Sequence, residues 1–115
     1  MTRDETLYLR HILDAINTVE EYLHDVNEER FNKTHLLQDG VIRQIEIIGE
    51  AVRHISQDIR RTYLEVPWQD VAGMRDKLIH DYFGVDLDKV WLTAQEDLPA
   101  LKQQVLRIMR DFGEM

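Results

Sequence analysis

An arginine, a histidine and a tyrosine stand within eight positions of one another, at Arg75, His80 and Tyr82. Arginine is permanently charged and can hold a phosphodiester through paired hydrogen bonds that also stabilise charge in a transition state. Histidine titrates near neutral pH and can move a proton to or from a ribose hydroxyl or a leaving group. This pair can support metal-independent RNA cleavage in which the 2′-hydroxyl of the RNA is the nucleophile. The same residues near a helix end often have only a structural role, so both interpretations remain open from residue chemistry.

Helix geometry limits how these side chains can meet. On an ideal helix, Arg75 and Tyr82 fall about 20° apart and share a face, whereas His80 lies about 140° from Arg75. Arg75 and His80 therefore converge only if the helix ends or bends near Ile79, or if a second subunit brings two copies together. An end near this point is expected, because Gly84 can adopt the left-handed conformation that terminates helices.

Apolar residues at three- and four-residue spacing predict the helices that position this segment. Thr2 and Glu5 form a predicted capping box at the start of the first helix. The interior glycines Gly40 and Gly49 indicate either close approach of another backbone or a tolerated weak point. The expected helices run from Arg3 to Asp25, from Thr34 to Arg61, from Pro67 to about Ile79, and from the N-cap Asp86, with a kink or restart capped by Asp97 before Pro99, to about Phe112; Asn27–Lys33 and Thr62–Val66 are expected to be connections.

This pattern predicts an all-α fold, an antiparallel bundle of four or five helices in a single domain over residues 1–115. Apolar residues that spill past one stripe of the second helix favour a homodimer. The chain has no cysteine, which excludes disulfides and thiolate metal sites and allows a reducing cytoplasm. No apolar run approaches a membrane span, and a cytoplasmic protein without membrane contact is expected.

The formal net charge of −8 argues against a general nucleic-acid coat protein. It leaves room for a local basic cleft or for a basic partner protein. Neither a metal site nor a cofactor is expected. The single Glu-x-x-His pair, Glu21 and His24, lacks the second pair of a di-iron bundle, and a solvated helix face explains it better. Three further histidines, His11, His35 and His54, have no spacing that would join them in one site.

The stretch from Arg75 to Tyr82 resembles the Arg-x4-His-x-Tyr motif of the HEPN superfamily, and more specifically that of the HepT-like toxins. The resemblance covers essentially the whole chain. Besides the motif, it rests on the segments Ile47-Ile48-Gly49-Glu50-Ala51, Val66-Pro67-Trp68, Ala72-Gly73-Met74-Arg75, His80-Asp81-Tyr82-Phe83-Gly84-Val85-Asp86, Val90-Trp91 and Asp97-Leu98-Pro99-Ala100-Leu101.

The resemblance implies a homodimeric HEPN fold in which two motifs face each other across a cleft. It also implies the toxin of a HepT/MntA type II toxin–antitoxin system, an RNase whose antitoxin is a small MNT-type, MntA-like nucleotidyltransferase. In that family the antitoxin can transfer AMP from ATP to the motif tyrosine, here Tyr82. Arg75 would bind the scissile phosphate, His80 would act as general acid or base, and Asp76 and Tyr82 would support the motif.

One position departs from the common pattern. The residue after the motif arginine is commonly asparagine, and this chain has Asp76, which also occurs in the family. A carboxylate beside Arg75 is expected to pair with it and to weaken its hold on phosphate. Two hypotheses follow: a ribonuclease toxin with an RNA substrate, and a non-catalytic dimeric helical module that binds a nucleotidyltransferase partner.

Overall fold

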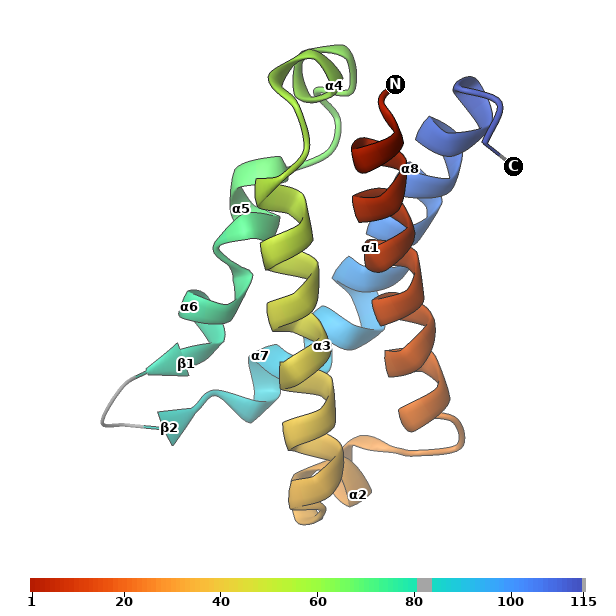
Figure 1. Ribbon diagram of the computed structural model, residues 1–115. Coiled ribbons are helices and arrows are strands. Elements are labelled where there is room, and N and C mark those ends of the chain that lie inside the picture. Colours follow the sequence, from red (N-terminus) through yellow and green to blue (C-terminus); the bar gives the residue numbers. More distant parts are fainter. Residues whose placement is uncertain (81–83, 115) are drawn as a thin grey trace.

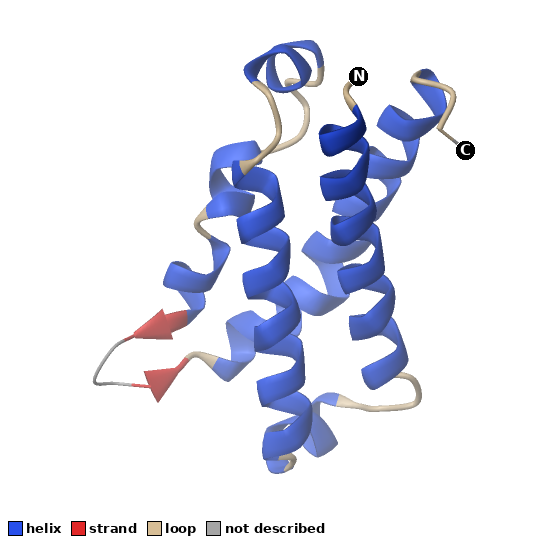
Figure 2. Ribbon diagram, viewed as in Figure 1, coloured by secondary structure: helices blue, strands red, loops and turns tan. Residues whose placement is uncertain are grey.

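In the computed structural model, helices pack around one core, and the structure describes residues 1–80 and 84–114 (Figure 1). Two antiparallel strands of two residues each interrupt the helical order (Figure 2). The elements are α1 (Arg3–Tyr22), α2 (Glu28–Lys33), α3 (His35–Arg53), α4 (Gln57–Thr62), α5 (Trp68–Ala72), α6 (Met74–Leu78), β1 (Ile79–His80), β2 (Gly84–Val85), α7 (Leu87–Leu92), the π-helix η1 (Thr93–Asp97) and α8 (Leu98–Asp111). The prediction of an all-α fold is confirmed.

The core lies where α1, α3 and α8 meet, with α1 and α3 running antiparallel side by side (Figure 1). Each helix contributes one apolar stripe, because residues three and four apart lie on the same face. The buried members of the stripes include Leu9, Ile12, Ile16 and Val19 of α1, Val41, Ile45, Ile48 and Val52 of α3, and Leu98, Leu101, Val105 and Ile108 of α8. Burying each such side chain stabilises the fold by about 1.5–3 kcal/mol.

The first helix begins as predicted. The Thr2 hydroxyl accepts a hydrogen bond from the Glu5 backbone N–H at 3.2 Å, and the Glu5 carboxylate accepts one from the Thr2 N–H at 3.1 Å. This is the reciprocal capping box. The pKa of Glu5 is lowered, chiefly by a hydrogen bond from the Ser56 hydroxyl and further by those from Thr2. Glu5 and Ser56 also line one surface hollow, so the start of α1 lies near the start of α4.

The predicted connection over Asn27–Lys33 is wrong. These residues form α2, because the Asn27 side chain caps the Arg30 N–H at 2.9 Å. Phe31 on this short helix is fully buried and its ring lies 5.4 Å from that of Trp91. The buried Phe31 side chain thus anchors α2 to the core, although α2 is too short to show an apolar repeat in the sequence.

The predicted long helix from Thr34 to Arg61 is also wrong, since α3 ends at Arg53 and α4 starts at Gln57. The Ser56 hydroxyl caps the new helix by accepting from the Ile59 N–H at 3.2 Å. Arg60 folds back and donates to the carbonyl oxygens of Val52 at 2.6 Å and Ile55 at 3.1 Å. Carbonyl groups at the end of a helix have no partner within the helix. Arg60 therefore stabilises the break between α3 and α4, which the apolar period of the sequence does not reveal.

The predicted third helix is divided at Gly73 into α5 and α6, and Pro67 occupies the N-cap rather than the first turn. The predicted end near Ile79 is confirmed: Ile79 is extended, and the Asp86 N–H donates to the Leu78 carbonyl at 2.9 Å across the hairpin. Gly84 has a φ of 82°, but in β2 rather than at a helix end.

The last predicted helix begins as expected, because the Asp86 carboxylate accepts from the Lys89 N–H at 3.2 Å. The predicted restart capped by Asp97 is wrong: Asp97 is helical and makes no capping hydrogen bond. The chain widens instead into the π-helical turn η1, where the Leu98 N–H bonds to the Thr93 carbonyl. Pro99 lacks a backbone donor, and the wider turn accommodates this without breaking the helix.

Gly49 confirms the interpretation of an interior glycine as a point of close backbone approach. A Cβ atom there would lie 3.2 Å from the Ala72 carbonyl oxygen, which belongs to α5. At Gly40, in contrast, the neighbour is the side chain of Tyr22 at 2.9 Å. Gly49 therefore sets the distance between α3 and the α5–α6 segment that carries Arg75.

Candidate active site

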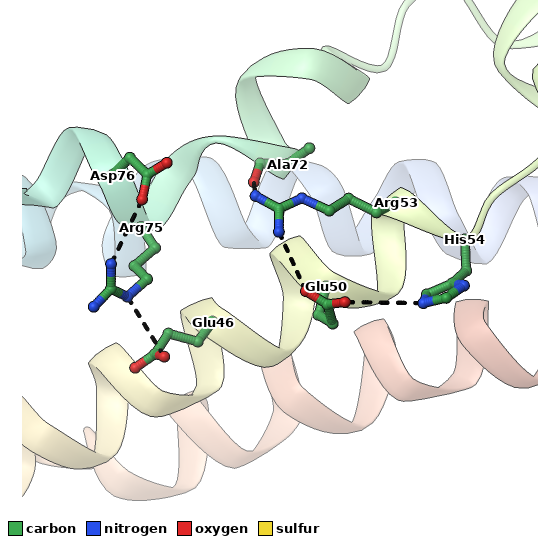
Figure 3. A network of polar contacts seen from close by, with 7 residues as sticks. All are labelled: Glu46, Glu50, Arg53, His54, Ala72, Arg75 and Asp76. Atoms are coloured by element: carbon green, nitrogen blue, oxygen red, sulfur yellow. Dashed lines mark hydrogen bonds and ion pairs between the residues drawn. The ribbon is translucent and has the colours of Figure 1, made fainter.

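Arg75 projects from α6 toward α3, and its guanidinium lies between Glu46 of α3 and its neighbour Asp76 on α6 (Figure 3). Its Nε lies 3.5 Å from Glu46 Oε2, and its Nη1 lies 3.5 Å from Asp76 Oδ1. The Arg75 side chain is 49% exposed and that of Asp76 is 74% exposed. The expected pairing of Asp76 with Arg75 is confirmed. Glu46, 29 positions earlier in the chain, was not anticipated.

A groove of about 550 Å³ runs along α3 beside these residues. Three arginines and three carboxylates face it, so their charges balance while its histidines are neutral. The groove is therefore not the basic cleft that the net charge left room for. Its lining residues are Tyr8, His11, Arg43, Glu46, Ile47, Gly49, Glu50, Ala51, Arg53, His54, Ala72, Arg75 and Asp76.

A second polar cluster lies about one helical turn further along α3 (Figure 3). Arg53 donates to Glu50 Oε2 at 3.2 Å and to the Ala72 carbonyl at 3.3 Å. The other Glu50 oxygen lies 3.9 Å from His54 Nε2. Arg53 thus ties α3 to the end of α5 through a carbonyl that the helix itself leaves free.

Aromatic side chains complete this end of the groove. The Tyr8 ring, from α1, stacks on His54 with centroids 4.4 Å apart and planes 10° apart, and His11 meets Tyr8 edge-on at 5.8 Å. His11 and His54 thus both contact Tyr8 and line the groove, a proximity that their spacing in the sequence does not show. They are 43 positions apart in sequence, and only the antiparallel packing of α1 on α3 brings them together.

Only some of the predicted motif residues can be placed relative to the groove. Arg75 and Asp76 line the groove, and His80 belongs to β1, immediately after the end of α6. The His80 side chain and Tyr82 lie outside the described residues. Arg75 and His80 were expected to converge if the helix ended near Ile79 or if a second subunit took part, and α6 does end at Leu78.

Glu21 and His24 were predicted to be surface residues, and both are exposed, with His24 Nε2 3.3 Å from Asp25 Oδ2. Among the side chains of residues 1–79 and 84–114, no three from His, Asp or Glu are grouped to hold a metal ion. Over the same residues, no helix has both the length and the apolar character needed to cross a membrane.

A family model described as "Ribonuclease HepT-like" matches residues 12–108. The chain belongs to the HepT-like ribonuclease family. The matched range includes α3, the α5–α6 segment and the whole of the predicted motif. It leaves out residues 1–11, with Tyr8 and His11 of α1, and residues 109–115. The resemblance inferred from sequence segments is thereby confirmed.

Relatives from archaea share much of this sequence. A Methanocaldococcus jannaschii protein named "Gamma-glutamylcyclotransferase and putative RNase" is 46% identical over 99% of this chain, which spans 51% of that protein. A second protein of the same organism, named "Putative RNase", is 41% identical over 97% of both chains. The "Probable ribonuclease HepT" of Thermococcus cleftensis is 46% identical over 89% of this chain and 93% of its own length. No solved structure matches the chain significantly.

Proposed function

We propose that this protein is a metal-independent endoribonuclease in which Arg75 and His80 act on a single phosphodiester. The observation that carries the proposal is Arg75 itself. It is the first residue of the motif, in a chain of the HepT-like ribonuclease family, and its half-exposed guanidinium faces a groove. The relatives named as RNases support the same activity.

In the proposed reaction the 2′-hydroxyl attacks the adjacent phosphorus, and the bond to the 5′-oxygen of the next nucleotide breaks. The products are a 2′,3′-cyclic phosphate and a free 5′-hydroxyl, so no water is consumed in this step. Arg75 holds the non-bridging oxygens, whose negative charge grows in the transition state. His80 takes the proton from the nucleophile or gives one to the leaving oxygen.

The ion pairs of Arg75 set a condition on this mechanism. Glu46 and Asp76 lie beside Nε and Nη1 of the guanidinium and compete there with an incoming phosphate. Asp76 is three-quarters exposed, and an exposed ion pair contributes at most about 1 kcal/mol. RNA can therefore displace Asp76 readily. Glu46, 35% exposed, is the firmer of the two partners.

Cleavage of RNA by the purified, unmodified protein in the presence of EDTA tests the proposal. Wild-type protein should cleave single-stranded RNA, whereas Arg75→Ala and His80→Ala should lose about 100-fold or more of that activity. Expression of the wild type should arrest bacterial growth. Arrest of equal strength by His80→Ala would contradict the catalytic assignment.

We extend the proposal to a type II toxin–antitoxin system in which an MNT-type, MntA-like nucleotidyltransferase neutralises this homodimeric toxin. The hydroxyl oxygen of Tyr82 attacks the α-phosphate of ATP, pyrophosphate leaves, and the tyrosine proton passes to solvent. Incubation with the partner and ATP should add mass in steps of one AMP. An equal gain with Tyr82→Phe, or none with the wild type, would refute this assignment.

A non-catalytic dimeric module that engages the nucleotidyltransferase is the second candidate. The observation that favours it is the pairing of Arg75 with two carboxylates, which offsets the charge of the motif arginine. Purified dimer that binds its partner but leaves a broad set of RNAs intact would establish this alternative.

A further inference from the structure

The groove has an aromatic end as well as a cationic one. Arg75 meets α3 at Glu46, whereas the stacked pair of Tyr8 and His54 lies two turns further along the same helix. Eight residues of α-helix span about 12 Å. This distance is too great for His54 to act on a phosphate held by Arg75 of the same chain, and it suits a neighbouring nucleotide.

The stacked pair presents an aromatic surface to the groove. Tyr8 covers one face of the His54 ring, yet the His54 side chain remains 49% exposed. Because one face is covered, that exposure comes from the other face and the edge of the ring. Glu50 stands 3.9 Å from Nε2 at the edge and limits rotation of the ring. The uncovered face is thus presented in a defined orientation.

Further arginines line the groove, although its three carboxylates balance the charge of its three arginines. Arg53 lies beside His54, where its contacts with Glu50 and the Ala72 carbonyl hold its guanidinium against α3 (Figure 3). Arg43 lines the groove as well. Cations that follow a groove, together with aromatic faces along it, are the combination by which proteins bind single-stranded nucleic acids.

We infer that the Tyr8–His54 pair is a base-stacking subsite for single-stranded RNA, placed along the groove from the phosphate held by Arg75. The identity of the ligand rests on the proposed ribonuclease function. The subsite binds through stacking, which every base can provide. It therefore favours unpaired RNA over duplex, because a paired base has no free face to offer.

Binding of a non-cleavable probe tests the subsite without any requirement for catalysis. The probe is a short, fluorescent single strand of mixed sequence with 2′-O-methyl groups, which remove the nucleophile. Fluorescence anisotropy measures its affinity, and a matched strand with abasic residues measures the contribution of the backbone alone. The protein is the full chain in its native oligomeric state.

His54→Ala should weaken binding of the base-containing strand about 5- to 150-fold, the equivalent of about 1–3 kcal/mol per stacked base. Binding of the abasic strand should change little. His54→Phe should restore the affinity, because it keeps the ring and removes the polar nitrogens. The matched control is His24→Ala, an exposed histidine outside the groove, which should bind both strands as the wild type does.

Tyr8→Phe keeps the ring that stacks on His54 and should bind both strands as the wild type does. The inference is overturned if His54→Ala binds both strands with wild-type affinity, or if it weakens both strands equally. It is also overturned if the folded wild type binds neither strand. Stacking-dependent binding without cleavage of ordinary RNA would leave the subsite established and refute the proposed function alone.

Discussion

Arg75 is held by one carboxylate next to it in sequence and by another that only the fold supplies. The neighbour, Asp76, could be predicted to pair with it, because adjacent residues at a helix start cannot separate far. Glu46 could not, since its contact depends on how α6 lies against α3. The grouping of Tyr8, His11 and His54 could not be predicted for the same reason: it depends on how α1 packs against α3, which the sequence does not show.

Replacing Asp76 by asparagine should raise RNA cleavage. The substitution removes one of the two competing charges on Arg75, and an exposed pair of this kind is worth at most about 1 kcal/mol. We expect kcat/KM to rise by up to about fivefold, measured with unmodified protein at low salt. The gain should shrink as salt rises, because screening weakens exposed pairs.

The matched control for this effect is Asp97→Asn, which removes an exposed carboxylate that does not line the groove. It changes the net charge by the same amount and should leave cleavage nearly unchanged. Equal gains from both substitutions would show that net charge, rather than release of Arg75, is responsible.

At the scale of the elements, the long helices follow from apolar periodicity and the short ones do not. The stripes of α1, α3 and α8 are long enough to display a period. The break between α3 and α4 keeps Ile55 and Ile59 at helical spacing although the helix stops, so the stripe alone conceals it. Arg60, which bonds to the carbonyls at the break, carries no local sequence signal for that role.

Gly49→Ala should destabilise the protein and reduce its activity. Alanine favours a helix by about 1 kcal/mol over glycine, but its Cβ would lie 3.2 Å from the Ala72 carbonyl oxygen, which belongs to rigid backbone. The α5–α6 segment must then move outward and carry Arg75 with it. Urea denaturation and RNA cleavage measure the two effects.

Gly40→Ala is the control on the same helix. Its Cβ would meet only the ring of Tyr22, a side chain that is 40% exposed and can turn aside. The gain in helix propensity should then appear as a neutral or slightly raised free energy of unfolding. A loss of stability as large as that of Gly49→Ala would contradict the distinction between side-chain and backbone neighbours.

The capping box of α1 predicts a pH effect on stability. Hydrogen bonds from Ser56 and Thr2 lower the pKa of Glu5 in the folded protein. A lowered folded-state pKa stabilises the protein at pH values above the unfolded-state pKa, and this contribution is lost as the pH falls through the folded-state pKa. Glu5→Gln should therefore lower the urea midpoint at pH 7 and lower it less at about pH 3, below the unfolded-state pKa. An equal loss at both pH values would contradict this assignment.

At the scale of the molecule, two observations bear on assembly. The net charge is −8, and the groove offers RNA no net positive charge from its arginines and carboxylates. A second copy facing the first would bring a second Arg75 to the same RNA strand, although it would bring its own carboxylates too. Helix α6 also ends at Leu78 and His80 belongs to β1, so the arginine and the histidine of the motif lie on different elements.

A shared cleft predicts a dimer by light scattering at micromolar concentration and predicts complementation between inactive subunits. If each site takes Arg75 from one chain and His80 from the other, a mixed dimer of Arg75→Ala and His80→Ala chains has one intact site and one doubly mutated site. Co-expressed chains with different affinity tags, purified through both, should regain about half of the wild-type kcat, while each mutant homodimer stays inactive. Sites contained within one chain would leave the mixed dimer as inactive as its parents, and a monomer at these concentrations would exclude the shared cleft outright.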